Sequence, residues 1–199
     1  AFSLAFLSQA PKTAPVAFVE KRLAMRISIF TALVLAVGFF LPPVAAQDST
    51  FPTIKARTLN KDRITVPKGF TAARNILLLS FGRDMQESVD AWDAALASVR
   101  ESSDNVQVYN APLIPKPNGI IRGFINGGFR GIYKDEGMRD RVVILYIDED
   151  EVFPALNISD DDKLQPLVMI TDQAGVILGR IAGVVDDANV ARVTELVTQ

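Results

Sequence analysis

The sequence of 199 residues contains no cysteine and no histidine. Without cysteine the chain can form no disulfide, no thiolate nucleophile and no zinc site built on sulfur. Without histidine it lacks the Ser-His-Asp type of catalytic triad, the imidazole metal ligand and the side chain that titrates nearest to neutral pH. Only carboxylates, lysine, tyrosine and the backbone remain for chemistry. We therefore expect no catalytic residue, no cofactor and no metal ion.

An apolar stretch near the N-terminus predicts export. Met25 and Arg26 form a short basic start, residues 27–41 are almost all apolar, and small residues lead to a cleavage position after Ala46. This three-part pattern, over residues 25–46, is typical of a secretory signal peptide. The apolar run is shorter than the roughly 20 residues that a helix needs to cross a bilayer, which favours cleavage. We expect a periplasmic or extracellular protein; an uncleaved signal would instead tether the same domain to the membrane.

The rest of the chain divides into a short leader and one domain. Residues 1–24 are interpreted as a gene-start artefact or a leader, with an organelle transit peptide as the alternative. Residues 47–199 are expected to form a single domain. Without residues 1–46, the 21 basic and 23 acidic residues become 17 and 22, a net charge of −5. This acidic balance argues against nucleic-acid binding.

The remaining 153 residues alternate between strand and helix patterns. Apolar or alternating runs predict strands at residues 63–67, 76–81, 106–114, 142–147, 167–171 and 176–181. Apolar residues at helical spacing predict helices at residues 84–100, 118–133, 148–156 and from residue 186 onward. Asp84 and Glu87 fit a capping box at the start of the first helix, and residues 47–51 are interpreted as an unstructured lead. The order of elements predicts an α/β fold with a central mixed sheet and helices on both faces.

The sequence resembles the thioredoxin-like superfamily, especially its peroxiredoxin-like and exported members. Residues 76–81, followed by a helix that carries Trp92, are similar to the strand and helix on either side of that family's active-site loop. Residues 164–177 are similar to the segment in which a cis-proline precedes a hairpin. The resemblance implies a thioredoxin-like three-layer fold and makes Pro166 the cis-proline candidate.

One branch of this superfamily has no cysteine, and it includes the mitochondrial ATP-synthase assembly factors. Residues 122–130 and 139–146 are similar to the central block of that branch. The redox members carry a cysteine in the loop that corresponds to residues 82–88, where this chain offers only Met85 and Ser88. Because a serine hydroxyl cannot perform reversible disulfide exchange, we expect neither thiol-disulfide oxidoreductase nor peroxidase activity.

Glycines recur at intervals of four in the predicted helix at residues 118–133. Such a stripe allows another backbone to approach closely. We expect it to serve close packing inside the domain, or to mark an irregular helix; a docking surface for a partner or for a second copy is the alternative. The glycines are Gly119, Gly123, Gly127 and Gly131, with Gly128 in addition.

The same region is locally basic and aromatic. Arg122 and Arg130 are interleaved with Phe124, Phe129 and Tyr133, and these five residues form the possible partner-binding surface. Arginine and aromatic side chains could hold an anionic or peptide partner by bidentate and stacking contacts. An ordinary solvated face is the other interpretation.

The opposite charge gathers in residues 148–162, which carry seven acids and no base. Acids in the first turn of a helix are favoured by its dipole, so helix capping and a soluble surface explain them best. Calcium binding is the alternative, although the run lacks the spacing and the central glycine of an EF-hand. Head-to-tail pairing of the acidic and basic blocks between copies also remains open.

Three functions remain in contention. The favoured one is an exported, non-redox thioredoxin-fold protein that acts by protein binding or assembly. The second is an enzyme that uses carboxylates with Tyr133 or Tyr146, which requires a concave pocket with a desolvated acid. The third is a non-catalytic partner of thiol proteins, which requires a groove beside Pro166 that Met85 and Phe81 leave open. We expect a protein partner, membrane contact only through an uncleaved signal, and leave a homo-oligomer open.

Overall fold

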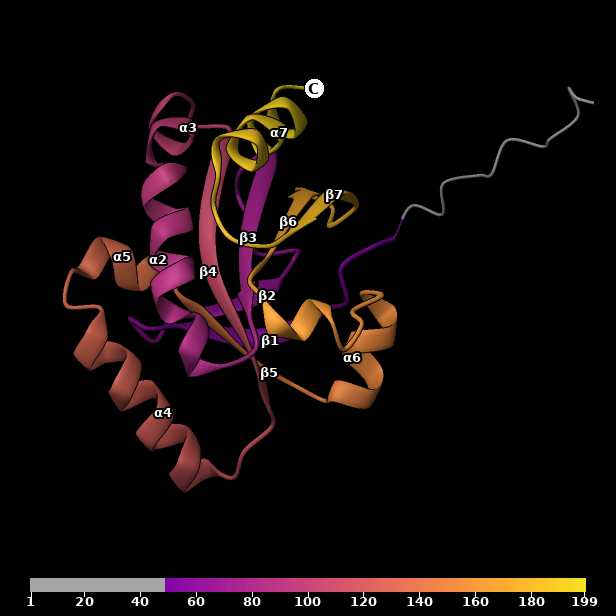
Figure 1. Ribbon diagram of the computed structural model, residues 1–199. Helices are drawn as coiled ribbons and strands as arrows, with labels where there is room; N and C mark the ends of the chain where they lie inside the picture. Colours follow the sequence, from indigo (N-terminus) through magenta and orange to yellow (C-terminus); the bar gives the residue numbers. More distant parts are fainter. Residues whose placement is uncertain (1–48) are drawn as a thin grey trace, which may run out of the picture. The chain divides into compact units, whose positions relative to one another are not determined.

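Seven strands form one mixed sheet in the computed structural model, which describes residues 49–199 (Figure 1). The strands are β1 (Ile54–Thr58), β2 (Arg63–Val66), β3 (Arg74–Ser80), β4 (Val106–Pro115), β5 (Val143–Ile147), β6 (Leu167–Asp172) and β7 (Ile177–Ala182). Their order in the sheet is β2-β1-β5-β4-β3-β6-β7. β3, β4 and β5 run parallel, while the remaining neighbours pair antiparallel. The sheet confirms the predicted α/β class.

Helices cover both faces of this sheet, as predicted. They are α2 (Gln86–Ala95), α3 (Ala97–Glu101), α4 (Gly119–Ile132), α5 (Glu136–Arg141), α6 (Glu149–Ala155) and α7 (Asp187–Thr198), with short 3-10 turns η2 (Arg83–Met85) and η3 (Asp162–Leu164). On one face, Trp92 of α2 and Val193 of α7 are fully buried against alternate residues of β3, β4 and β6. On the other face, Phe153 of α6 joins a separate cluster of buried side chains. Residues Gln47–Gln199 form one unit that contains these cores.

β3 lies in the interior of the sheet, between β4 and β6, and its residues 76–79 are at most 1% exposed. Side chains of successive strand residues point to opposite faces, so a strand buried on both faces must be apolar at every position. The unbroken apolar run predicted this strand. Burying four such side chains contributes roughly 6–12 kcal/mol.

The N-terminal hairpin of β1 and β2 differs from the prediction. β2 is an edge strand that ends before Pro67, as expected, but β1 was not predicted. The unstructured lead is wrong for Phe51, which is 2% exposed and whose backbone N–H donates to the Gly175 carbonyl at 2.8 Å. In the sequence, one aromatic residue after a polar stretch does not distinguish a buried segment from an unstructured one.

The first predicted helix is divided and is capped differently. Asp84 lies inside η2 and caps nothing; Met85 occupies the N-cap position of α2 without a side-chain hydrogen bond. The helix breaks at Leu96, which is fully buried, and continues as α3. The capping-box interpretation is therefore wrong, because a tight 3-10 turn precedes the α-helix.

Three other helices begin near the predicted residues, and the β6–β7 turn lies where the sequence predicted a turn. The side chains of Asn118, Asp148 and Asp186 accept backbone hydrogen bonds at the starts of α4, α6 and α7. In the turn, Asp172 accepts from the Val176 N–H at 2.8 Å, and Gly175 has a φ of 92°. A side chain at Gly175 would be strained by this backbone conformation.

The cis-proline prediction is wrong. Among residues 49–199 the cis peptide bond joins Val66 to Pro67, and the bond before Pro166 is trans. Gln165 is extended, and the Pro166 carbonyl accepts from the Gly183 N–H at 2.9 Å, so the trans proline leads directly into the β6–β7 pairing. The expectation came from the resemblance alone, and only about 5% of X-Pro bonds are cis.

Within residues 49–199, no helix combines the length and the apolar character needed to span a membrane. Residues 27–41, on which the signal-peptide prediction rests, lie outside the described residues.

Candidate functional site

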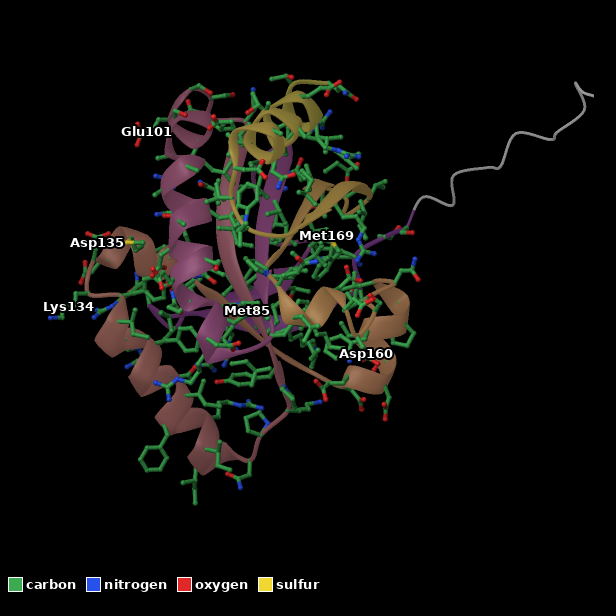
Figure 2. All side chains as sticks on the ribbon, viewed as in Figure 1. Met85, Glu101, Lys134, Asp135, Asp160 and Met169 are labelled. Atoms are coloured by element: carbon green, nitrogen blue, oxygen red, sulfur yellow. The ribbon has the colours of Figure 1, made fainter. Side chains whose placement is uncertain are left out.

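Packing side chains fill the loop after β3, which corresponds to the loop where the resemblance implies a redox cysteine. Met85 is 6% exposed, and its sulfur accepts the Phe81 N–H at 3.5 Å. The Phe81 ring contacts Phe153 edge to face, with ring centroids 6.0 Å apart. Figure 2 shows Met85 at the start of α2, in the interior of the molecule. The position has become part of the core, which weakens the idea that it receives the thiols of a partner.

A cleft of about 650 Å³ lies elsewhere, between α4 and the face of the sheet formed by β1, β2 and β5. Thirteen residues line it: Lys55, Ala56, Arg57, Thr58, Lys61, Arg63, Ile64, Thr65, Arg122, Asn126, Arg130, Ile144 and Tyr146. Its volume is within the range of ordinary ligand pockets. We call it the basic cleft.

The basic cleft concentrates positive charge without compensation. Six of its thirteen lining residues are lysine or arginine, and none is aspartate or glutamate. The ion pairs in the described part of the chain use other cations, so none of the six has an acidic partner there. Arg57 lies directly opposite Arg63 in the β1–β2 ladder, an arrangement of like charges that is destabilising. An anion in the cleft would relieve this repulsion.

Contacts within the protein hold the α4 side of the cleft in place. The Arg122 guanidinium lies 4.6 Å from the centroid of the Tyr146 ring, and the Tyr146 hydroxyl donates to the Asn126 side-chain oxygen at 3.1 Å. Arg130 donates through Nε to the Leu59 carbonyl at 2.9 Å. Both arginines are thus positioned before any ligand arrives, which lowers the entropic cost of binding.

Tyr133 holds this region together and is not a contact residue. It is 4% exposed; its hydroxyl accepts from the side-chain amides of Asn110 and Gln86, at 2.5 Å each, and donates to Asp90 at 3.1 Å. Burial raises the pKa of Tyr133, so its hydroxyl is neutral at physiological pH. Its place on the predicted binding surface is therefore wrong, since it joins the end of α4 to α2 and β4.

The tyrosine-carboxylate enzyme also finds no support at this cleft. Tyr146 lines the cleft, and burial raises its pKa while Arg122 lowers it. The second partner that the hypothesis requires, a desolvated acid, is not among the lining residues. The one tyrosine that contacts an acid, Tyr133, does so through Asp90, outside the lining of the cleft.

The five residues of the predicted partner surface therefore separate into three environments. Arg122 and Arg130 line the basic cleft. Phe129 is half-buried and stacks on Tyr133, with centroids 6.5 Å apart. Phe124 is 78% exposed and does not line the cleft. The sequence analysis placed the surface on the right helix but assigned residues from different sides of that helix to one surface.

The glycine stripe does not serve packing inside the domain. α4 is a regular helix of 14 residues with no fully buried side chain. A Cβ built on any of its five glycines meets nothing within 4 Å among the described residues. Both favoured interpretations, close internal packing and an irregular helix, are wrong because the glycines face outward. The docking alternative stays a prediction.

Four cations of the cleft escaped the sequence analysis. Lys55, Arg57, Lys61 and Arg63 belong to the hairpin around the unpredicted strand β1. Their signal was an alternation in which Ile54 and Ala56 pack inward, while the charged Lys55 and Arg57 that alternate with them are exposed. A five-residue strand with two charges is easily mistaken for a loop.

The acidic segment serves mostly the protein's own structure. Asp148 caps α6, and three further acids occupy its first turn, as predicted. Asp162 binds Arg180 at 3.0 Å and accepts two hydrogen bonds from Ser159. Burial alone would raise the pKa of Asp162, but the hydrogen bonds from Ser159 and the charge of Arg180 outweigh it and hold that pKa below its usual value. Within residues 49–199, no acids cluster in a way that could hold a metal ion.

Comparison with known proteins identifies the fold class. No protein-family model and no curated protein matches the sequence. Among solved structures, the thioredoxin domain of a thiol-disulfide oxidoreductase from Bacteroides vulgatus is similar, with a TM-score of 0.52 and 14% identity over 75% of this chain and 96% of that one. A thiol:disulfide interchange protein from Bacteroides sp. has a TM-score of 0.51 and 13% identity, over 77% and 91% of the two chains. BsSco, a member of the Sco family of cytochrome c oxidase assembly proteins, has a TM-score of 0.52 and 9% identity, over 76% and 95%.

These likenesses show a thioredoxin-like fold. At such low identity they show the fold alone. The narrower resemblance to ATP-synthase assembly factors stays a prediction.

Proposed function

We propose that this protein is an exported, non-redox thioredoxin-fold protein that binds an acidic segment of a partner protein in the basic cleft. The observation that carries the proposal is the set of six cations around one cavity with no acid among the lining residues. Because such a cluster is costly in the free protein, a ligand with several negative charges is the complementary occupant.

A protein segment suits this cleft better than a single small anion. The cations come from two sides, the β1–β2 hairpin and α4, so one phosphate-sized group would reach only some of them. Ile64 and Tyr146, both partly exposed, also line the cleft and offer apolar surface. A segment that alternates carboxylates with aliphatic or aromatic residues matches both features.

The loss of the redox position supports binding over catalysis. The chain has no cysteine, and Met85 is packed into the core where the redox members place their reactive residue. With the usual reaction removed, what remains on the surface is a preformed cationic cavity.

Capture of partners from an envelope fraction tests the proposal. Arg57→Glu with Arg63→Glu reverses two exposed charges in the cleft, neither of which has an ion pair to lose. Arg83→Glu with Arg192→Glu makes the same change of charge at exposed positions outside the cleft. We expect the cleft variant to lose its partners and the control variant to keep them. Unchanged capture by the cleft variant would overturn the proposed site.

Export is tested separately by N-terminal sequencing of the protein recovered from the cell envelope or the medium. The signal pattern predicts a mature chain that begins at Gln47. Recovery of the protein solely from the cytoplasm would contradict export and leave the cleft proposal standing.

A further inference from the structure

α4 presents large apolar side chains that nothing in the described structure covers. Ile120 and Phe124 are 76% and 78% exposed, and Ile121 and Ile132 are each 49% exposed. At about 100° per residue, these four positions fall within roughly 120° of the helix circumference. We call them the outer strip. Figure 1 shows α4 projecting at the lower left, apart from the centre of the sheet.

The outer strip and the basic cleft lie on different sides of the helix. Arg122, Asn126 and Arg130 turn toward the cleft, and none of the four outer-strip residues lines it. At 100° per residue, Gly128 and Gly131 fall in the same arc of the helix circumference, and no polar residue of α4 does. A second surface is thus available while the cleft is occupied.

Positive charge stands at both ends of this apolar side. From Lys116 to Lys134 the sequence has four basic residues and no acidic one. Lys116 and Lys134 are both exposed. Figure 2 shows Lys134 at the corner between α4 and α5, with its side chain directed away from the fold. Asp135 and Glu136 follow Lys134 and are exposed as well, so residues 116–141 together carry six basic and three acidic residues, a net charge of +3.

A second copy of the chain fits this surface poorly. The 14 residues of α4 make a helix of about 21 Å, too short for a pair of such helices to bury the roughly 1,200 Å² typical of stable interfaces.

We infer that α4 docks on an anionic lipid bilayer, with the outer strip at the boundary between headgroups and acyl chains. Interfacial helices combine an exposed apolar face with lysine or arginine placed to meet anionic headgroups. Lys116 and Lys134 occupy such places. This inference goes beyond the proposed function, because it assigns a second surface that would hold the basic cleft beside the membrane.

Cosedimentation with vesicles tests the inference, using residues 47–199 so that the apolar run at residues 27–41 cannot contribute. This unit has its own cores, and circular dichroism checks its fold. We expect binding to vesicles that contain phosphatidylglycerol, weak binding to pure phosphatidylcholine, and weakening by salt. Equal binding to both vesicle types, or to neither, would overturn the inference.

A matched pair of variants identifies the surface. Ile120→Ser with Phe124→Ser should lower vesicle affinity at least about tenfold, because each side chain loses its burial in the acyl region. Leu164→Ser with Val184→Ser removes side chains that are 79% and 63% exposed on other parts of the fold, and should leave binding unchanged. Equal binding by the two variants would contradict the role of α4.

Two further readouts separate this inference from its alternatives. Analytical ultracentrifugation that shows a dimer lost only in the outer-strip variant would replace the bilayer with a second copy. The outer-strip variant should still bind acidic peptide through the cleft. If the wild-type unit bound acidic peptide but no vesicles, the membrane inference would be overturned and the proposed function would stand.

Discussion

At the scale of single residues, Tyr133 shows how this fold uses a polar group that might be taken for a catalyst. Tyr133→Phe leaves the buried amide of Asn110 without its acceptor, and we expect a loss of about 1–3 kcal/mol in the free energy of unfolding. Urea denaturation measures it. Tyr146→Phe is the control, since its hydroxyl bond to Asn126 is only part-buried and should cost less. Equal losses would contradict the account of Tyr133.

Met85, in the turn after β3, is a second residue whose role is packing. Met85→Ala removes most of a buried side chain, so we expect a loss of about 2–4 kcal/mol in the free energy of unfolding. Ser88→Ala, in the first turn of α2, should change stability by less than about 0.5 kcal/mol. If thermal unfolding showed the two substitutions to be equivalent, Met85 would not be a packing residue.

Asp162 gives a prediction with a defined pH window. The pKa of Asp162 is lowered in the folded state, so the stability it contributes is present above its unfolded pKa of about 4 and is lost as pH falls through the folded value. We expect wild type to exceed Asp162→Asn in unfolding free energy at neutral pH, and the difference to shrink below about pH 4. A difference that stays constant down to pH 2 would show that the carboxylate charge contributes nothing.

At the scale of elements, α4 is a regular helix that contains five glycines, residues with a low intrinsic helix propensity. Glycine in a helix interior costs up to about 1 kcal/mol relative to alanine, and a Cβ at Gly127 or Gly131 has open space around it. Gly127→Ala and Gly131→Ala should each raise the free energy of unfolding by about 0.5–1 kcal/mol. Gly175→Ala should lower it instead, since its φ is 92° and a Cβ would lie 2.1 Å from the Pro67 ring. Denaturant midpoints that fall in all three variants would contradict the exposed position of the α4 glycines.

The elements that sequence analysis recovered are those with strong local patterns. The apolar runs of β3 and β5 and the cap of α4 by Asn118 each depend on a few neighbouring residues. The failures concern weaker or non-local features. β1 is short and charged, and the direction in which the α4 glycines face depends on how the helix lies on the sheet.

At the scale of the whole molecule, the candidate site was only half predictable. Arg122 and Arg130 were named because they stand in an obvious basic stretch. Arg57 and Arg63 come from near the start of the domain, whereas α4 lies near its middle; they line the same cleft because β1 pairs with β5. That pairing joins residues more than 60 positions apart, which no local pattern reveals.

The direct test of the central claim is the binding of a fluorescent acidic peptide, measured by anisotropy at low and at physiological ionic strength. Wild type should bind the peptide and lose affinity as salt rises, and Arg57→Glu with Arg63→Glu should weaken binding at least about tenfold. Arg83→Glu with Arg192→Glu should bind like wild type, because the net charge changes equally while the cleft stays intact. Equal weakening by both pairs, or no binding by wild type at low salt, would contradict the account of the basic cleft.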